Sequence, residues 1–410
     1  MKAIDTKDNQ LYVEDIPVIQ ITKEYGSPAF IYSSKAINDN FQSYQSEIRE
    51  GDLICYAVKA NSNLHILKLL SDLGSGFDVV SGNELKRCIL AGADKNKIVF
   101  SGVAKTEEEI TLAIENDILS INIESYGEFE RILEVSKELN KKVNCALRVN
   151  PDIAIGSHKY IQTGSKTSKF GLDKESVLKI SSQCEIDGPI KLTSVASHIG
   201  SQISDENLIL ESVDYLIEIA DELAKNGHNI EYLDIGGGLG IQYRDEEEGS
   251  PKILLEKVKE LLSERDFKII LEPGRSVIGT AGILVSKVEY IKEAGEKKFA
   301  IIDAGMNDLI RPSLYEAWHK VVEVDHQNTD LDLYDLAGPV CETGDVLAKD
   351  RNLKIMPGDH VAFMDVGAYG SVMTSNYNSR LRPIELLVTK DKVQVIKRKE
   401  SFEDIVALET

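Results

Sequence analysis

A lysine stands where an apolar run gives way to a polar loop. Lys59 follows the apolar residues 53–58 and precedes the polar stretch 60–63. At the end of a buried strand a lysine loses its charge at little cost, and the neutral amine is the form that condenses with a carbonyl to give a Schiff base. The alternative is a lysine that buries its stem and keeps its ammonium in water. The groups that follow similar runs farther along the chain favour the first interpretation.

Charged and polar side chains lie on or after several other apolar runs. Asp78 lies on the second run, and His198 follows the sixth. The glycines 236–238 follow the seventh run, and Glu272 and Arg275 follow the eighth. If the runs are parallel strands of a barrel, their carboxyl ends meet at one rim, where such barrels carry out their chemistry. These groups are therefore predicted to share one site.

The glycine run favours an anion-binding turn. Consecutive glycines let backbone N–H groups approach a phosphate without a Cβ in the way, although a tight turn with positive φ would need glycine as well. The run lacks the Gly-x-Gly-x-x-Gly pattern and comes late in the chain, which excludes a dinucleotide-binding unit. A phosphate beside a Schiff-base lysine indicates pyridoxal 5′-phosphate. Glu272 is then placed to keep the ring nitrogen of this cofactor protonated, and His198 either covers the ring or is an ordinary core residue.

Alternating strand and helix patterns must position these groups. Short runs rich in β-branched residues are followed by segments with apolar residues at helical spacing, such as 107–115 and 126–138,. Eight such units match a closed (β/α)₈ barrel of the TIM type rather than an open doubly wound sheet. The eight predicted strands are 53–58, 76–80, 97–100, 118–123, 143–149, 193–197, 232–235 and 268–271.

The rest of the chain predicts a second domain. From about residue 281 the pattern changes to β-rich segments such as 283–290 and 384–388. The N-terminal strand 10–13 is expected to join this later sheet, because the first barrel strand starts only after a helical stretch at 34–48. The predicted fold is thus an α/β barrel, residues 31–280, inserted into a mainly β domain of residues 1–30 plus 281–410.

Composition limits the partners and the compartment. The 410 residues carry a net charge of −21 and show no basic stripe with interleaved aromatics, which argues against nucleic acid and anionic membranes as partners,. No apolar run approaches the length of a membrane span. The five cysteines contain no Cys-x-x-Cys pair, so neither a metal site nor a disulfide framework is expected, and a cytoplasmic protein with reduced thiols is predicted. These cysteines are Cys55, Cys88, Cys145, Cys184 and Cys341.

Ordered motifs along nearly the whole chain resemble one family. The chain resembles the fold-type III pyridoxal-phosphate enzymes, whose barrel is like that of alanine racemase, and within them the diaminopimelate decarboxylases. The resemblance rests on YAVKAN at 56–61, FSGVAK at 100–105, RVNP at 148–151, HIGSQ at 198–202, GGG at 236–238, EPGR at 272–275, CETGD at 341–345 and GAY at 367–369.

The resemblance implies a role for each motif residue. Lys59 would form the Schiff base, Asp78 would lie in the cofactor site, His198 would stack on the ring, and Glu272 would pair with the ring nitrogen. The phosphate would be held by Ser201, Gly237, Gly238, Gly274, Arg275 and Tyr369. The carboxylate at the far end of the substrate would bind Arg275, Arg311 and Tyr315, with Glu342 and Tyr369 also contacting the substrate and Cys341 as proton donor.

The resemblance also implies the reaction and the assembly. The activity would be decarboxylation of meso-2,6-diaminopimelate to L-lysine and carbon dioxide, the last step of lysine biosynthesis. The protein would be a homodimer in which Cys341 and Glu342 of one subunit complete the site of the other.

Alternative functions have distinguishing features. An amino-acid racemase would place an arginine against the ring nitrogen, where this chain has the acidic Glu272. A non-catalytic pyridoxal-phosphate carrier would lack the second domain and the Cys341–Glu342 pair. Decarboxylases of ornithine, arginine or carboxynorspermidine stay open, because substrate length depends on loop details that spacing does not reveal.

Overall fold

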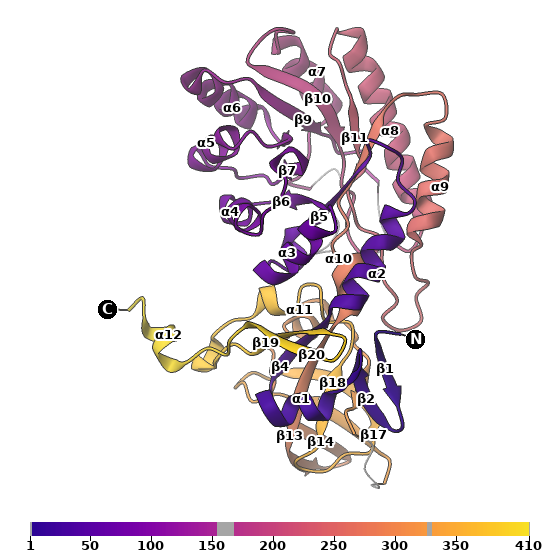
Figure 1. Cartoon of the computed structure of the whole chain (residues 1–410), viewed down its shortest axis with the longest axis vertical. Helices are drawn as coiled ribbons and strands as arrows, with labels where there is room; N and C mark the ends of the chain where they lie inside the picture. The colour runs from indigo at the N-terminus through magenta and orange to yellow at the C-terminus, as the bar shows by residue number, and fades with distance from the viewer. Residues whose placement is uncertain (1, 154–167, 326–329, 410) are drawn as a thin grey trace. The chain divides into compact units, whose positions relative to one another are not determined.

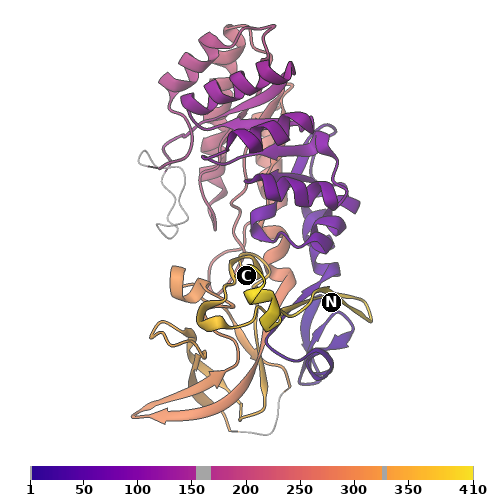
Figure 2. The same ribbon diagram turned by 90° about the vertical axis from the view of Figure 1, so that its left-hand side faces the viewer.

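The computed structural model describes residues 2–153, 168–325 and 330–409. These residues form two units, shown in two views in Figures 1 and 2. The barrel unit comprises residues 41–241 and 247–276, and the β unit comprises residues 1–40, 242–246 and 277–410. The domain boundaries predicted from the sequence, between residues 30 and 31 and between residues 280 and 281, stay predictions.

The core of the barrel unit is a closed sheet of parallel strands. Within the described residues it contains eight strands in the order β10-β11-β12-β5-β6-β7-β8-β9, which confirms the predicted barrel. Most of the strands are buried over nearly their whole length, as expected where helices cover the outside and side chains fill the inside. The strands are β5 (Leu53–Ala57), β6 (Gly76–Val79), β7 (Ile98–Phe100), β8 (Ser120–Ile123), β9 (Val143–Arg148), β10 (Ile190–Ala196), β11 (Tyr232–Asp234) and β12 (Lys268–Leu271).

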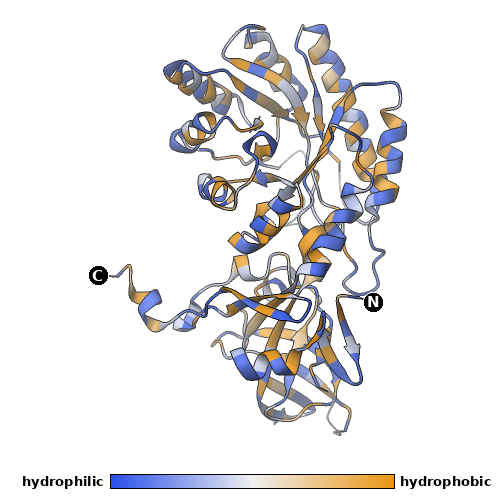
Figure 3. Ribbon diagram, viewed as in Figure 1, coloured by the Kyte–Doolittle hydropathy of each residue, from blue (hydrophilic) through white to orange (hydrophobic). Residues whose placement is uncertain are grey.

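Helices follow the strands because each loop ends in a residue that caps the next helix. Thr106 forms a capping box with Glu109, and the side chain of Ser81 accepts a hydrogen bond from the N–H group of Glu84,. Figure 3 shows apolar and polar positions alternating along α8 and α9, as expected of helices that bury one face. The helices of this unit are α3 (Leu64–Asp72), α4 (Gly82–Leu90), α5 (Glu107–Glu115), α6 (Tyr126–Leu139), α7 (Lys174–Gln183), α8 (Glu206–Lys225) and α9 (Pro251–Leu261); α2 (Ser34–Gln45) and α10 (Arg275–Ile278) run across the unit boundaries.

A larger sheet organises the β unit. Its main path runs β17-β16-β14-β13-β4-β19-β20, and β18 pairs with both β13 and β15. The side chains of Ile31, Val285 and Leu386 pack in its apolar core. The elements are α1 (Val18–Tyr25), β4 (Ala29–Ser33), β13 (Gly282–Ala294), β14 (Lys297–Ile302), α11 (Arg311–Tyr315), β15 (Val321–Glu323), β16 (Asp332–Ala337), β17 (Val346–Leu353), β18 (His360–Phe363), β19 (Ile384–Thr389), β20 (Lys392–Lys397) and α12 (Phe402–Val406).

The expectation for the N-terminal strand is wrong in its pairing. The strand β2 (Gln10–Val13) forms a small antiparallel sheet with β1 (Ile4–Lys7) and β3 (Ile16–Pro17), and only an isolated bridge joins Gln10 to Asp325. The strand β4 instead lies in the middle of the large sheet, between β13 and β19. All five residues of β4 are buried, whereas β2 is buried only at alternate positions, and a central strand needs apolar residues on both faces.

Candidate active site

Lys59 lies in a short turn at the carboxyl end of β5. Its neighbours Val58 and Ala60 are fully buried, whereas its own side chain keeps 30% exposure. Its Nζ donates a hydrogen bond of 2.5 Å to Oδ2 of Asp78, which is fully buried on β6. The register pairs Ala57 with Asp78, so the turn that follows β5 brings the amine over the end of the neighbouring strand. The structure thus brings together Lys59 and Asp78, two of the predicted site residues.

Polar side chains fill the inside of the barrel toward this end. Cys55, Val99 and Ile270 contact one another although β5 and β7 are not neighbours in the sheet, so their side chains meet inside the barrel. Asp78 is in register with Val99, and Asp234 with Ile270. Because side chains alternate between the two faces of a strand, both carboxyl groups point inward.

Glu272 follows β12 by one residue and is 6% exposed. It points to the same face as Ile270, two residues earlier. Burial raises the pKa of Glu272 well above its usual range, and the nearby carboxyl groups of Asp234 and Asp78 raise it further,. Its Oε1 is buried and has no hydrogen-bond partner among the described residues. A buried oxygen without a partner is suited to accept a hydrogen bond from a bound molecule.

His198 follows β10 and is held by the glycine turn. Its Nδ1 accepts a hydrogen bond of 3.1 Å from the N–H group of Gly237, so a neutral ring carries its proton on Nε2. Burial lowers the pKa of His198 well below its usual value, and the positive charges of Lys59 and Arg148 act in the same direction. The imidazole is therefore neutral at physiological pH, as suits a ring that stacks on another ring.

The protonation of His198 gives a pH prediction. Because the folded pKa is lowered, the unfolded chain binds the proton more tightly, and the free energy of unfolding falls as pH drops below about 6.5. The contribution of this residue to the slope is at most about 1.4 kcal/mol per pH unit. We expect His198→Gln to reduce the slope of urea stability against pH between about pH 5 and 6.5. An unchanged slope in His198→Gln would contradict the neutral ring; His65→Gln, at an exposed histidine, is measured beside it.

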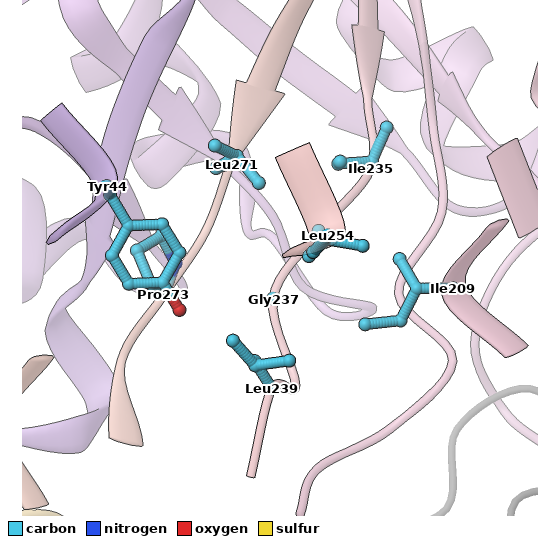
Figure 4. A pocket seen from close by; sticks show the side chains of 9 residues that line it. Tyr44, Ile209, Ile235, Gly237, Leu239, Leu254, Leu271 and Pro273 are labelled. Carbon is cyan, nitrogen blue, oxygen red and sulfur yellow. The ribbon is translucent and has the colours of Figure 1, made fainter. Parts of the chain in front are cut away.

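The glycine turn after β11 has no room for side chains. A Cβ on Gly237 would lie 2.1 Å from the carbonyl oxygen of Glu272, and one on Gly238, where φ is +99°, would lie 2.3 Å from that of Gly200. Behind the turn is a cavity of about 10 Å³ lined by apolar side chains. Figure 4 shows this lining, with Ile209, Ile235, Leu239, Leu254 and Leu271 pointing into it. The rear of the turn is thus held by apolar packing, which leaves the other side for an anion.

Substitution of Gly237 tests the close packing of the turn. We expect Gly237→Ala to destabilise the protein by roughly 2 kcal/mol, because the added Cβ overlaps backbone that cannot move aside freely. Gly127 is the control: it lies in α6 with nothing within 4 Å of a Cβ, and Gly127→Ala should stabilise by up to about 1 kcal/mol. Urea unfolding of both variants checks this. Equal stability of the two variants would show that the turn relaxes around a side chain.

Arg275 and Ser201 lie together at the same end of the barrel. The Nε and Nη2 atoms of Arg275 donate hydrogen bonds of 3.3 and 3.1 Å to Oγ of Ser201. A Cβ on Gly274 would lie 3.0 Å from Cβ of Ala60, so the loop after β12 is packed against the turn that carries Lys59. The structure therefore places all the predicted cofactor residues of the barrel unit at the carboxyl ends of its strands.

Apart from Arg275, the predicted substrate residues lie in the β unit. Arg311 opens α11 and is 6% exposed. Its Nη1 donates a hydrogen bond of 2.9 Å to Nε2 of the fully buried His319, whose Nδ1 donates one of 2.9 Å to the carbonyl oxygen of Met364. The guanidinium carbon lies 4.8 Å from the ring centroid of Tyr243,. These contacts fix the plane of the guanidinium group, and Tyr315 closes the same short helix.

Cys341 and Glu342 occupy an exposed loop before β17. Their loop is held at one end by Asp345, whose carboxylate accepts hydrogen bonds of 2.6 Å from the N–H groups of Met306 and Val340. The hydroxyl of Tyr377 donates to Oε1 of Glu342 at 2.5 Å. Ser313 of α11 donates to the carbonyl oxygen of Gly344 at 2.7 Å. Within the β unit, the helix of Arg311 and the loop of Cys341 are thus side by side, and Tyr369 lies in the loop after β18 with φ of +55°.

Sequence reasoning missed several polar residues inside the barrel. Glu124 accepts a hydrogen bond of 2.6 Å from Arg148, and its two oxygens also accept N–H groups of Gly102 and Gly171 at 3.0 Å. Asp234 and Asn122 are likewise buried there. The sequence does contain a pattern that could have identified Asn122 and Glu124. In and just after β8, the polar residues Ser120, Asn122 and Glu124 alternate with isoleucines.

The barrel unit fits pyridoxal phosphate on observations of its own residues. The buried Oε1 of Glu272 lacks a partner among the described residues, the glycine turn admits no Cβ, and an amine lies at the same mouth. Pyridoxal phosphate presents a ring nitrogen, a phosphate and an aldehyde, which are the complements of these three features. No three His, Cys, Asp or Glu side chains in the described parts of the chain are grouped to hold a metal ion. The fold and these groups define the class as a barrel enzyme that uses pyridoxal phosphate.

Comparison with known proteins narrows this class. The pyridoxal binding domain of the pyridoxal-dependent decarboxylases matches residues 34–279. The diaminopimelate decarboxylase of Haemophilus influenzae is 42% identical over 416 residues, with complete coverage of both chains. The crystal structure of the Helicobacter pylori diaminopimelate decarboxylase complexed with L-lysine is 39% identical, has a TM-score of 0.92 and is matched over 96% of this chain and 99% of its own. That of the M. jannaschii enzyme, also with L-lysine, is 37% identical with a TM-score of 0.94, over 100% and 98%.

The chain belongs to the pyridoxal-dependent decarboxylases and, within them, to the diaminopimelate decarboxylase family. The predictions of family, fold, cofactor and enzyme class are confirmed by these findings. Among the helices in the described part of the chain, none combines the length and apolarity that crossing a bilayer demands.

Proposed function

We propose that the protein decarboxylates meso-2,6-diaminopimelate to L-lysine and carbon dioxide, the last step of lysine biosynthesis. The observation that carries this is an identity of about 40% along the full chain to proteins named diaminopimelate decarboxylase. Two crystal structures of such proteins contain L-lysine. Glu272 speaks against a racemase, because an acid opposite the ring nitrogen keeps that nitrogen protonated, whereas an arginine would not.

The barrel residues are proposed to hold the cofactor. Lys59 attaches it covalently and Asp78 orients the amine before attachment. His198 covers one face of the ring, and Glu272 accepts the hydrogen bond of the ring nitrogen. The neutral state of His198 and the buried oxygen of Glu272 support these two roles. The phosphate is proposed to bind Ser201, Gly237, Gly238, Gly274, Arg275 and Tyr369.

The residues of the β unit are proposed to recognise the substrate. Arg311 and Tyr315, together with Arg275, bind the carboxylate that is not lost, while Glu342 and Tyr369 contact the other polar groups. A planar guanidinium held by His319 and Tyr243 favours bidentate binding of a carboxylate,. A fixed carboxylate site at the far end would separate diaminopimelate from ornithine or arginine, which carry no second carboxylate.

The chemical step requires a proton donor. When bound, the cofactor acts as an electron sink for the bond between the α-carbon and the carboxylate. Carbon dioxide leaves, and the α-carbon takes one proton in its place. Cys341 is the proposed donor of this proton, and Glu342, next to it in sequence, is proposed to contact the remaining polar groups of the substrate. The amine of Lys59 then releases L-lysine.

The assembly and location are also proposals. We infer a homodimer with shared active sites, in which the loop of Cys341 and Glu342 from one subunit serves the barrel of the other. The exposure of this loop in the single chain supports an interface role. A cytoplasmic location without nucleic-acid partners is proposed from the net charge of −21 and from five cysteines that are all free,.

Carbon dioxide release tests the substrate assignment. The protein loaded with pyridoxal phosphate is incubated separately with meso-diaminopimelate, L-lysine, ornithine and arginine, and released carbon dioxide and the chirality of the recovered amino acid are measured. Release from meso-diaminopimelate alone is expected. Release from ornithine or arginine instead would keep the decarboxylase but overturn the substrate, and inversion of chirality without release would indicate a racemase.

A further inference from the structure

Two buried carboxyl groups on neighbouring strands face each other inside the barrel. Asp234 ends β11 and is in register with Ile270 of β12, so Glu272 lies on the same face and one step closer to the mouth,. Backbone hydrogen bonds fix this register, since Ile235 donates to Ile270 at 3.0 Å and Glu272 donates to Gly236 at 2.7 Å. The two carboxyl groups are close enough for each to shift the pKa of the other.

The oxygens of this carboxyl pair are incompletely satisfied. Oδ1 of Asp234 accepts a hydrogen bond of 3.0 Å from the N–H group of Gly236. Oδ2 of Asp234 and Oε1 of Glu272 are both buried and have no donor among the described residues. Carboxylate oxygens are acceptors only, so two of them bond to each other only when a proton lies between them. The pair is therefore satisfied by holding one proton.

The surrounding charges lead to the same conclusion. The cations near the pair are matched by other acids: Lys59 by Asp78 at 2.5 Å and Arg148 by Glu124 at 2.6 Å. Asp234 and Glu272 belong to no ion pair found among the described residues, and Cys55 and Asn122, which also face them, bring no positive charge. Burial raises the pKa of both acids, and Asp234 raises that of Glu272 further, whereas polar contacts with Glu272 and Asn122 lower that of Asp234. Without the cofactor the proton of the pair therefore lies on Glu272, and a cationic ring nitrogen, which stabilises an ionised Glu272, shifts it to Asp234. Two ionised carboxylates here would be uncompensated, whereas one is what a protonated ring nitrogen requires.

We propose that Asp234 is a positioning residue for the cofactor: when the cationic ring nitrogen faces an ionised Glu272, Asp234 holds the proton of the pair and donates a hydrogen bond to the Glu272 carboxylate. This rests on the proposed role of Glu272. The hydrogen bond from Asp234 holds the plane of the Glu272 carboxylate, and the neutral state of Asp234 leaves a single negative charge at the inner end of the site.

Substitutions of Asp234 separate a neutral donor from a charged acid. Asp234→Asn keeps a donor and removes the possibility of charge, Asp234→Ala removes both, and Glu272→Gln is the reference for loss of the acid at the ring. The readouts are the visible absorbance of the bound cofactor, its dissociation constant, and the infrared carbonyl stretch of protonated carboxyl groups in the holoenzyme. Asp308→Asn, at a buried acid of the β unit, controls for the infrared measurement.

We expect Asp234→Asn to keep the cofactor absorbance and the cofactor affinity close to those of the unmodified protein. Asp234→Ala should bind the cofactor at least about tenfold more weakly. Asp234→Asn should also lose one protonated-carboxyl band that Asp308→Asn retains. An Asp234→Asn spectrum like that of Glu272→Gln, or no band lost, would overturn the proposal, even if Asp234→Ala does not fold. Unchanged absorbance in Glu272→Gln would instead refute the role of Glu272, while the infrared band still reports the proton on Asp234.

Discussion

Lys59→Ala is expected to lower the rate of decarboxylation by about 10³-fold or more and to remove the visible absorbance of the covalently attached cofactor. The reason is that no other amine is described at this position, where Asp78 holds Nζ at 2.5 Å over the end of the neighbouring strand. Treatment with borohydride followed by peptide mapping should fix the cofactor to the peptide of residue 59 in the unmodified protein and to none in the variant.

Two further variants distinguish loss of the amine from loss of its positive charge and from general destabilisation of the fold. Lys59→Arg keeps a cation beside Asp78 but cannot form the covalent link, so it should be as inactive as Lys59→Ala while retaining more of its stability. Lys68→Ala removes an exposed lysine of α3 that pairs with Asp72 on the surface, and should behave as the unmodified protein. Retention of the absorbance in Lys59→Ala would refute the attachment site.

The barrel could be predicted from the sequence because its strands are buried on both faces. A run such as 53–57 is apolar throughout, which separates it from the half-buried strands of an open sheet,. The groups at the rim could be predicted as well, because parallel strands of a barrel deliver whatever follows them to one end. Lys59, His198 and Glu272 each come directly after a run, so their shared end required no knowledge of distances.

The proton-sharing pair could not be predicted in this way. Asp234 stands two residues before the glycine run, but its closeness to Glu272 depends on the stagger between β11 and β12. The stagger between neighbouring strands of a barrel cannot be read from the pattern and spacing of residues. The pairing of the N-terminal strand failed for a related reason: residues 10–13 and 29–33 both have strand character, and the choice between them depends on which run is buried on both faces.

His319 and Asp345 show the same limit in loops of the β unit. His319 has no distinguishing neighbour in the sequence, yet it fixes Arg311 because its other nitrogen is bonded to Met364. Asp345 was part of a recognised motif, but its function of holding the loop of Cys341 became apparent only from its two hydrogen bonds to backbone N–H groups. Residues that act through other residues are found from contacts rather than from order along the chain.

Mixed dimers are expected to recover activity from two inactive variants. Lys59→Ala and Cys341→Ala should each be nearly inactive alone, since one lacks the attachment point and the other the proposed proton donor. If each site takes Lys59 from one subunit and Cys341 from the other, half of the dimers in an equal mixture are hybrids, and each hybrid contains one intact site. About one quarter of the unmodified activity should then return in the co-expressed mixture, and about one half in hybrids purified through two different tags.

A second mixture shows whether the recovered activity comes from a site shared between two subunits. Lys59 and Glu272 both belong to the barrel unit of a single chain, so a hybrid of Lys59→Ala with Glu272→Gln has no site with both residues intact and should show no recovery. Recovery in the first mixture and none in the second requires that the loop of Cys341 act on a barrel of the partner subunit. Absence of recovery in both would place Cys341 with the barrel of its own chain or remove it from the site, and recovery in both would show only that dimerisation repairs a damaged fold.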